Sequence, residues 1–149
     1  MRILLLNGPN LNTLGQRETE VYGHLTLADI EGRVAERAKA LGVEIRAFQS
    51  NHEGGLIDYL QQEAPEADGI IINPGAFSHY SLALRDTLAG SDRPVIEVHI
   101  SNIYTREPFR RRSVTAGASR GVITGLGWRG YIAALDTLVE LLKEQATGS

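Results

Sequence analysis

Residues 3–6 read Ile3-Leu4-Leu5-Leu6, an uninterrupted apolar run that leads directly into Asn7-Gly8-Pro9. A strand with one face in solvent alternates apolar and polar residues, whereas a continuous apolar run predicts a strand covered on both faces. Strands of that kind belong to parallel sheets flanked by helices. Short apolar runs also occupy residues 43–48, 69–72, 94–100 and 121–126. The sequence therefore predicts five parallel strands.

Helical patterns fill the gaps between these runs. The clearest one begins at Thr26 and Asp29, which have the spacing of a capping box, and ends at Gly42, a residue typical of helix C-termini. Three further helices are expected over residues 56–63, 81–88 and 131–142. Five βα units in succession predict an α/β fold with a flavodoxin-like, doubly wound, five-stranded parallel sheet.

Length, charge and composition limit the possible classes of function. The 149 residues suit a single domain (1–149), and residues 147–149 are expected to form a frayed tail. The absence of cysteine excludes disulfides, thiolate nucleophiles and Cys-ligated zinc. A formal charge of -3 gives no electrostatic reason to expect a nucleic-acid partner. The first apolar run is too short for a signal peptide or a membrane span, so we expect a cytoplasmic protein without a membrane partner.

Two connections, residues 11–25 and 101–119, are longer than ordinary loops of this fold. Both follow the carboxyl end of a predicted strand, where open α/β sheets bind ligands. Arg17 and Tyr22 lie in the first connection. A guanidinium near a phenol lowers the phenol's pKa, which is ordinarily about 10, and the resulting tyrosinate can act as a base. The alternative is that Tyr22 packs under the loop while Arg17 is solvated.

The third and fourth predicted strands end in polar residues. Asn73, Gly75 and His79 follow the third strand, and Glu97 and His99 belong to the fourth. Residues two apart in a strand share a face, so the Glu97 carboxylate can fix the tautomer of His99 and leave its other ring nitrogen for proton transfer. The alternative is a buried pair with a purely structural role.

Basic residues follow the fourth strand. Arg106 and Arg110 lie in the second long connection, where they either form a solvated face or hold an anionic or hydroxylated substrate. The four histidines lack the spacing of metal ligands, so no metal site is predicted.

Three other classes of protein share parts of this pattern. Residues 125–130 match a dinucleotide fingerprint, but no further strand follows to supply the ribose-binding acid, so we predict tight strand-to-helix packing there and no nucleotide cofactor. A flavin- or nucleotide-binding module needs a hydroxyl-rich phosphate loop, whereas the loop after the first strand offers only Thr13. A response-regulator-like phosphoacceptor needs carboxylates where Asn7 and Asn73 stand.

Four segments together resemble the type II 3-dehydroquinate dehydratases: Asn7-Gly8-Pro9-Asn10-Leu11-Asn12, residues 17–23, Asn73-Pro74-Gly75-Ala76 and Glu97-Val98-His99-Ile100-Ser101-Asn102. The similarity runs in order from Ile3 to about Leu142. It implies a lyase that converts 3-dehydroquinate to 3-dehydroshikimate in the shikimate pathway, without a cofactor. A biosynthetic role and a role in quinate breakdown both stay open.

The resemblance also implies catalytic roles. Tyr22 is the base that takes a proton beside the ketone, and Arg17 keeps it ionised. His99, oriented by Glu97, protonates the departing hydroxyl, and Asn10 helps to stabilise the enolate through a water. One departure is Thr19, where the family commonly has proline. The spacing of Arg17 and Tyr22 is unchanged.

Substrate-binding residues follow from the same matching. Asn73, in one segment with Gly75, would hold the substrate carboxylate and neighbouring hydroxyl together with the backbone N–H groups of Ile100 and Ser101. His79 and Arg110 would hold the ring hydroxyls, and Arg106 would close over the substrate. Asp86 matches a residue that a neighbouring subunit contributes, in a dodecamer built from trimers. The resemblance thus implies a homo-oligomer with shared sites.

Overall fold

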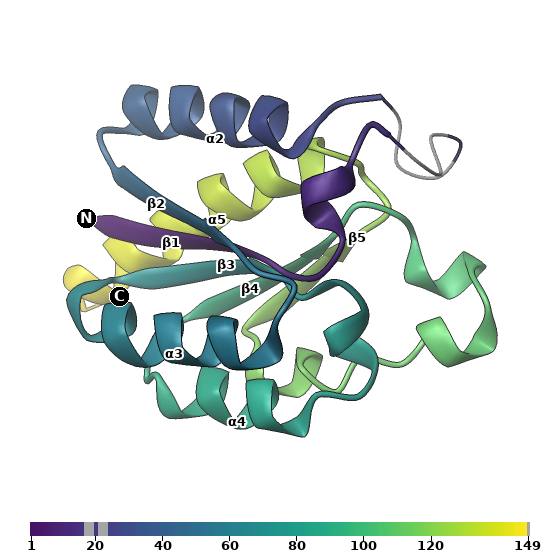
Figure 1. Ribbon diagram of the computed structural model, residues 1–149. Helices are drawn as coiled ribbons and strands as arrows, with labels where there is room; N and C mark the ends of the chain where they lie inside the picture. The colour runs from purple at the N-terminus through teal and green to yellow at the C-terminus, as the bar shows by residue number, and fades with distance from the viewer. Residues whose placement is uncertain (17–19, 21–23, 149) are drawn as a thin grey trace.

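The computed structural model describes residues 1–16, 20 and 24–148. A five-stranded parallel sheet with the order β2-β1-β3-β4-β5 runs through it (Figure 1). The strands are β1 (Arg2–Asn7), β2 (Glu44–Gln49), β3 (Gly69–Asn73), β4 (Val95–His99) and β5 (Gly121–Thr124). The α-helices are α2 (Leu27–Leu41), α3 (Glu53–Glu63), α4 (Leu82–Gly90) and α5 (Arg129–Ala146). The predicted flavodoxin-like sheet is confirmed.

Short 3-10 helices occupy the connections. They are η1 (Leu11–Thr13), η2 (Ala64–Glu66), η3 (Gly75–His79), η4 (Ile103–Thr105), η5 (Pro108–Arg110) and η6 (Ala116–Ala118). Three of them, η4 to η6, lie in the long connection after β4. That connection therefore has local structure that its sequence did not predict.

The ends of α2 follow the predicted chemistry, whereas the other three helices each extend beyond their predicted ranges at one or both ends. Thr26 and Asp29 form the capping box, and Gly42 adopts a φ of 73° that residues with a Cβ rarely take. Helix α3 begins at Glu53, one turn before the predicted start. The prediction missed the first turn because the apolar residues of this helix begin only at Leu56. Within the described ranges, no helix combines the length and apolarity needed to cross a membrane.

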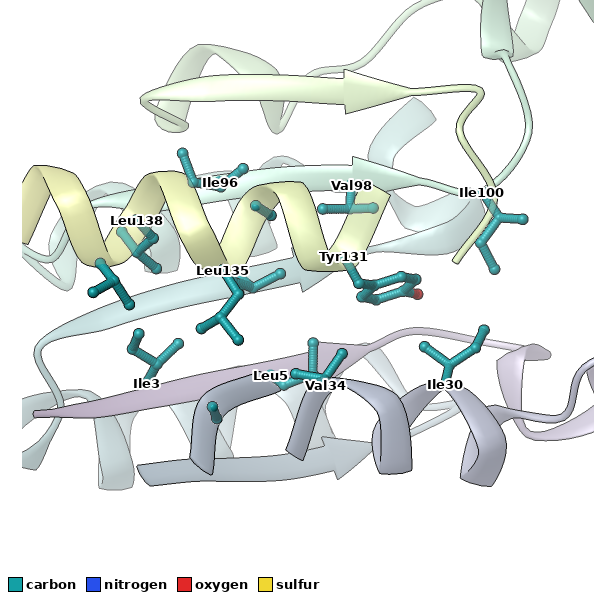
Figure 2. Close-up of a cluster of buried hydrophobic side chains, with 14 of the residues drawn as sticks. Ile3, Leu5, Ile30, Val34, Ile96, Val98, Ile100, Tyr131, Leu135 and Leu138 are labelled. Atoms are coloured by element: carbon teal, nitrogen blue, oxygen red, sulfur yellow. The ribbon is translucent and has the colours of Figure 1, made fainter. Parts of the chain in front are cut away.

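Helices cover the sheet on both sides. Helices α2 and α5 lie on one face, and α3 and α4 lie on the other (Figure 1). Ile3 and Leu5 of β1 pack toward α2 and α5 (Figure 2), whereas Leu4 and Leu6 pack toward α3 and α4. The central strands β1, β3 and β4 are buried along both faces, as predicted. That expectation was wrong for the edge strands β2 and β5, which are partly exposed.

The loops after β1 and β3 lie directly against each other at the carboxyl edge of the sheet. Asn7 pairs in register with Asn73, and the Gly8 N–H donates to the carbonyl oxygen of Asn73 at 2.8 Å. A Cβ at Gly8 would lie only 2.3 Å from the carbonyl oxygen of Pro74, so only glycine fits. Gly75 has a φ of 58° where it faces Pro9. The close contact fixes the two loops that lead into the candidate site.

Candidate active site

A cleft of about 180 Å³ opens at the carboxyl edge of the sheet. Its walls come from the connections after β1, β3 and β4, so the cleft lies at the sheet edge where the sequence analysis predicts the site. Most of the predicted site residues line it: Asn10, Asn73, Gly75, His79, His99, Ile100, Ser101, Arg106 and Arg110. Residues distant in sequence thus meet at one cleft.

Other predicted residues lie elsewhere. Arg17 and Tyr22 fall outside the described residues. Asp86 does not line the cleft of its own chain but lies exposed on α4, beside a shallow depression bordered by α3 and α4. Of the amides in the first loop, Asn7 is fully buried and Asn12 does not line the cleft, so only Asn10 supplies an amide from that loop.

Glu97 and His99 form a buried pair on one face of β4. The His99 Nε2 lies 2.7 Å from a carboxylate oxygen of Glu97. Glu97 is fully buried and His99 is 5% exposed. Two hydroxyls from the connection after β4 also donate to this carboxylate: Ser113 at 2.7 Å, and Thr115. The predicted contact is confirmed, and the buried carboxylate has three donors.

The surroundings of Glu97 settle which ring nitrogen of His99 carries a proton. Burial alone would raise the pKa of the Glu97 carboxyl, but hydrogen bonds from His99, Thr115 and Ser113 outweigh it and hold the pKa below its ordinary value. An ionised carboxylate only accepts hydrogen bonds, so the His99 Nε2 must carry the proton. Nδ1 is therefore the nitrogen left for chemistry.

Glu97→Gln should expose this pairing as a pH-dependent loss of stability. Because the folded-state pKa of Glu97 lies below the unfolded value of about 4.3, the ionised carboxylate stabilises the fold above that pH, and the stabilisation disappears as the pH falls through the folded-state pKa. We expect the variant to lose about 1–3 kcal/mol of unfolding free energy at neutral pH. Urea unfolding should show the difference from wild type shrinking below about pH 4. A difference that is constant with pH would contradict this account.

His79 is also held in one tautomer. Its Nδ1 lies 2.7 Å from the carbonyl oxygen of Arg112, which can only accept a hydrogen bond. Nδ1 therefore carries a proton, so in the neutral ring Nε2 presents a lone pair. A cleft-lining imidazole in this state can accept a hydrogen bond from a substrate hydroxyl.

The cleft is locally basic although the chain is acidic overall. Arg106 and Arg110 line it, and no aspartate or glutamate does so among the described residues. Glu107 lies behind both arginines: Arg110 Nε donates to its carboxylate at 2.8 Å, and Arg106 Nε lies 3.9 Å away. The hydrogen bond from Arg110 lowers the pKa of Glu107, so this carboxylate stays ionised. The lining suits a substrate with a negative charge.

Backbone donors add to this lining. No described residue accepts a hydrogen bond from the backbone N–H of Ile100 or Ser101, which follow β4 and line the cleft. Unpaired N–H groups at a strand end can bind a carboxylate or hydroxyl oxygen. As for metal ligands, no group of three His, Asp or Glu side chains is gathered within residues 1–16, 20 and 24–148.

Several residues that support the site escaped the sequence analysis. Asn10 has a φ of 69°, and its backbone N–H donates to the side-chain oxygen of Asn51 at 3.0 Å. Ser113 and Thr115 hold Glu97. Asn51, Ser113 and Thr115 are ordinary polar residues in loops, and only the fold brings them to their partners. The long connection 101–119 was the one signal that pointed toward Ser113 and Thr115.

Comparisons with known proteins agree with this geometry. The family model described as dehydroquinase class II matches residues 1–139. The 3-dehydroquinate dehydratase of Roseiflexus castenholzii is 60% identical over 139 residues, covering 93% of this chain and 88% of the relative. The crystal structure of the type II dehydroquinase from Butyrivibrio crossotus matches with a TM-score of 0.90 at 48% identity, covering 93% of this chain and 97% of that one. The type II dehydroquinase from Propionibacterium acnes matches with a TM-score of 0.88 at 42% identity, over 95% of this chain and 96% of the other. The chain therefore belongs to the class II dehydroquinases, the type II 3-dehydroquinate dehydratases, which are hydro-lyases.

Proposed function

We propose that the chain converts 3-dehydroquinate to 3-dehydroshikimate in two proton-transfer steps. Tyr22, ionised beside Arg17, takes a proton from the carbon next to the ketone and leaves an enolate. The enolate then expels the hydroxyl, which leaves as water after accepting a proton from His99. Asn10 stabilises the enolate through a water molecule. The electron pair of the broken C–H bond becomes the new double bond of the enone.

The buried His99–Glu97 pair is the observation that carries this proposal. An acid that protonates a leaving hydroxyl must hold a proton on the nitrogen that faces the substrate. With Nε2 bonded to Glu97 at 2.7 Å, protonated His99 carries that proton on Nδ1, and the carboxylate stabilises the imidazolium. The same carboxylate keeps three hydrogen bonds, so the ring stays in one orientation.

Substrate binding is assigned to the basic and amide lining. In this proposal the substrate carboxylate is held by the segment that contains Asn73 and Gly75 and by the backbone N–H groups of Ile100 and Ser101. His79 and Arg110 hold ring hydroxyls, and Arg106 closes over the bound substrate. The support is chemical: the lining offers cationic and neutral donors, together with the lone pair of His79 Nε2.

The activity is tested by mixing purified protein with 3-dehydroquinate and following the ultraviolet absorbance of the conjugated enone product. A chelator-treated sample should react at the same rate, because the proposed mechanism uses no metal ion. Absence of product with the wild-type protein would overturn the proposed reaction. Loss of activity only after chelation would keep the reaction but reject the metal-free mechanism.

We further propose that Asp86 completes the site of a neighbouring subunit in a dodecamer built from trimers. The support is its position: Asp86 is exposed on α4 and lies outside the cleft of its own chain. Asp86→Ala should lower kcat/KM by roughly ten- to hundredfold, because a charged hydrogen-bond partner of the substrate is lost. Light scattering should show that the variant keeps its assembly.

Mixed oligomers provide the sharper test of a shared site. Subunits with Asp86→Ala and subunits with Tyr22→Phe are each defective, but co-refolded mixtures pair an intact Tyr22 with an intact Asp86 from the neighbour. Random mixing should restore about a quarter of wild-type activity. If Asp86 and Tyr22 of the same subunit formed each site, mixing would create no intact site. The mixtures would then be no more active than the two variants measured separately.

A further inference from the structure

A chain of hydrogen bonds runs beneath the floor of the cleft. Tyr131 projects from the first turn of α5 into the layer between that helix and the sheet (Figure 2). Its hydroxyl donates to Asn7 Oδ1 at 2.7 Å and accepts from Asn73 Nδ2 at 2.9 Å. Asn7 and Asn73 are register partners at the ends of β1 and β3, so one phenol joins both strand ends.

The direction of every bond in this chain is set by one backbone group. The Gly75 N–H donates to Asn73 Oδ1 at 3.1 Å, and a backbone N–H has no other role. The carboxamide of Asn73 must therefore present Nδ2 to Tyr131. Because the phenol oxygen accepts that bond, its proton goes to Asn7 Oδ1. The arrangement leaves Asn7 Nδ2 buried without a partner among the described residues.

Asn73 is the only member of the three that lines the described cleft. Its amide has two N–H bonds, and Tyr131 accepts one of them. None of the described residues accepts the other. Asn73 as a whole is only 3% exposed, and it lines the cleft. An amide fixed in this way presents a donor to the ligand without reorganising.

We propose that Tyr131 is a positioning residue, which locks the Asn73 carboxamide so that its second N–H points at the substrate. The inference rests on the proposed role of Asn73 in holding the substrate. Tyr131 itself is fully buried and cannot touch the reacting atoms. Burial raises the pKa of its phenol well above the ordinary value, so the hydroxyl keeps its proton and its direction.

Tyr131→Phe removes only the hydroxyl and keeps the ring that fills the core. The Asn73 amide then loses its second anchor and must be ordered by the substrate. We expect KM for 3-dehydroquinate to rise by roughly five- to thirtyfold. The value of kcat should change by less than about threefold, because the interaction is lost equally from the ground state and the transition state. Tyr59→Phe is the matched control. The Tyr59 ring stacks on Phe48 and does not line the cleft, so this variant should leave KM and kcat unchanged.

A double-mutant cycle separates positioning from a general structural role. In an Asn73→Ala background, Tyr131→Phe should have no further effect on KM, because the group that it orients is gone. A structural contribution would instead raise KM by the same factor in both backgrounds. Equal factors, or an unchanged KM in the single variant, would overturn the inference.

Asn7→Leu tests the same chain from its other end if Tyr131→Phe does not fold. Without Asn7 the phenol hydroxyl loses the acceptor that holds it in place, so it no longer anchors Asn73 Nδ2 firmly, and KM should again rise at least fivefold. An unchanged KM there would reject the inference. Failure of the proposed function looks different, because the wild-type protein itself would then form no enone.

Discussion

Tyr22→Phe is expected to bind 3-dehydroquinate with near-normal affinity and to have a kcat that is lower by a factor of about 10²–10⁴. The substitution removes the oxygen that takes the carbon-bound proton and keeps the aromatic ring. No other tyrosine replaces it in the described cleft, whose lining contains none. Binding groups such as Asn73 and Arg110 are untouched, so calorimetric titration should give an affinity within a few fold of wild type.

Arg17 provides an independent check on the tyrosinate. If its guanidinium lowers the pKa of Tyr22, then Arg17→Gln should move the acidic limb of the kcat profile to higher pH and restore part of the activity as the pH rises toward about 10. Tyr59→Phe should behave like wild type at every pH. Near-normal turnover by Tyr22→Phe at neutral pH would reject Tyr22 as the base.

The fold followed from the sequence because its signals are local. Continuous apolar runs such as Ile3 to Leu6 mark strands buried on both faces, and Gly42 marks a helix end through its own conformation. The same reasoning failed at the sheet edges, since the exposure of β2 and β5 depends on having one neighbouring strand instead of two. In β2 the alternation of Glu44 and Arg46 with apolar residues already marks an exposed face, whereas β5 contains no charged residue that would mark its exposure.

In the candidate site, too, contacts between residues close in sequence could be predicted, and contacts that depend on the tertiary fold could not. Glu97 and His99 could be paired from sequence, because residues two apart in a strand share a face. Ser113 and Thr115 could not, since their contact with Glu97 requires the connection after β4 to fold back on itself.

Tyr131 illustrates how a single residue can serve two purposes. The sequence analysis placed it only at the start of an expected amphipathic helix, residues 131–142, and its ring does pack in the core with Val34 and Leu135. Its hydroxyl, however, meets two amides that are 124 and 58 residues away in the chain. Periodicity identifies the buried face of a helix but not the polar atom that a buried ring carries.

His99→Gln is expected to lower kcat by about 10²–10⁴-fold while leaving the fold largely intact. A glutamine amide can still donate to Glu97, so the buried carboxylate keeps a partner, but an amide cannot supply a proton to a departing hydroxyl. His99→Ala should lose similar activity and additionally about 1–3 kcal/mol of stability, since Glu97 then lacks one donor. Comparing the two variants separates the role of His99 as an acid from its contribution to stability through the hydrogen bond to Glu97.

Hydrogen exchange distinguishes the two proposed proton transfers most directly. In heavy water, Tyr22 should still take the proton next to the ketone in His99→Gln, exchange it for deuterium from the solvent and return the deuterium to the enolate, because only the second step is blocked. Nuclear magnetic resonance should therefore detect deuterium in unreacted substrate with His99→Gln and none with Tyr22→Phe. Exchange in Tyr22→Phe but not in His99→Gln would reverse the assignment and make His99 the base. Loss of exchange in both variants would mean that proton removal and hydroxyl departure occur in one concerted step, with Glu97 and His99 contributing to the first transition state.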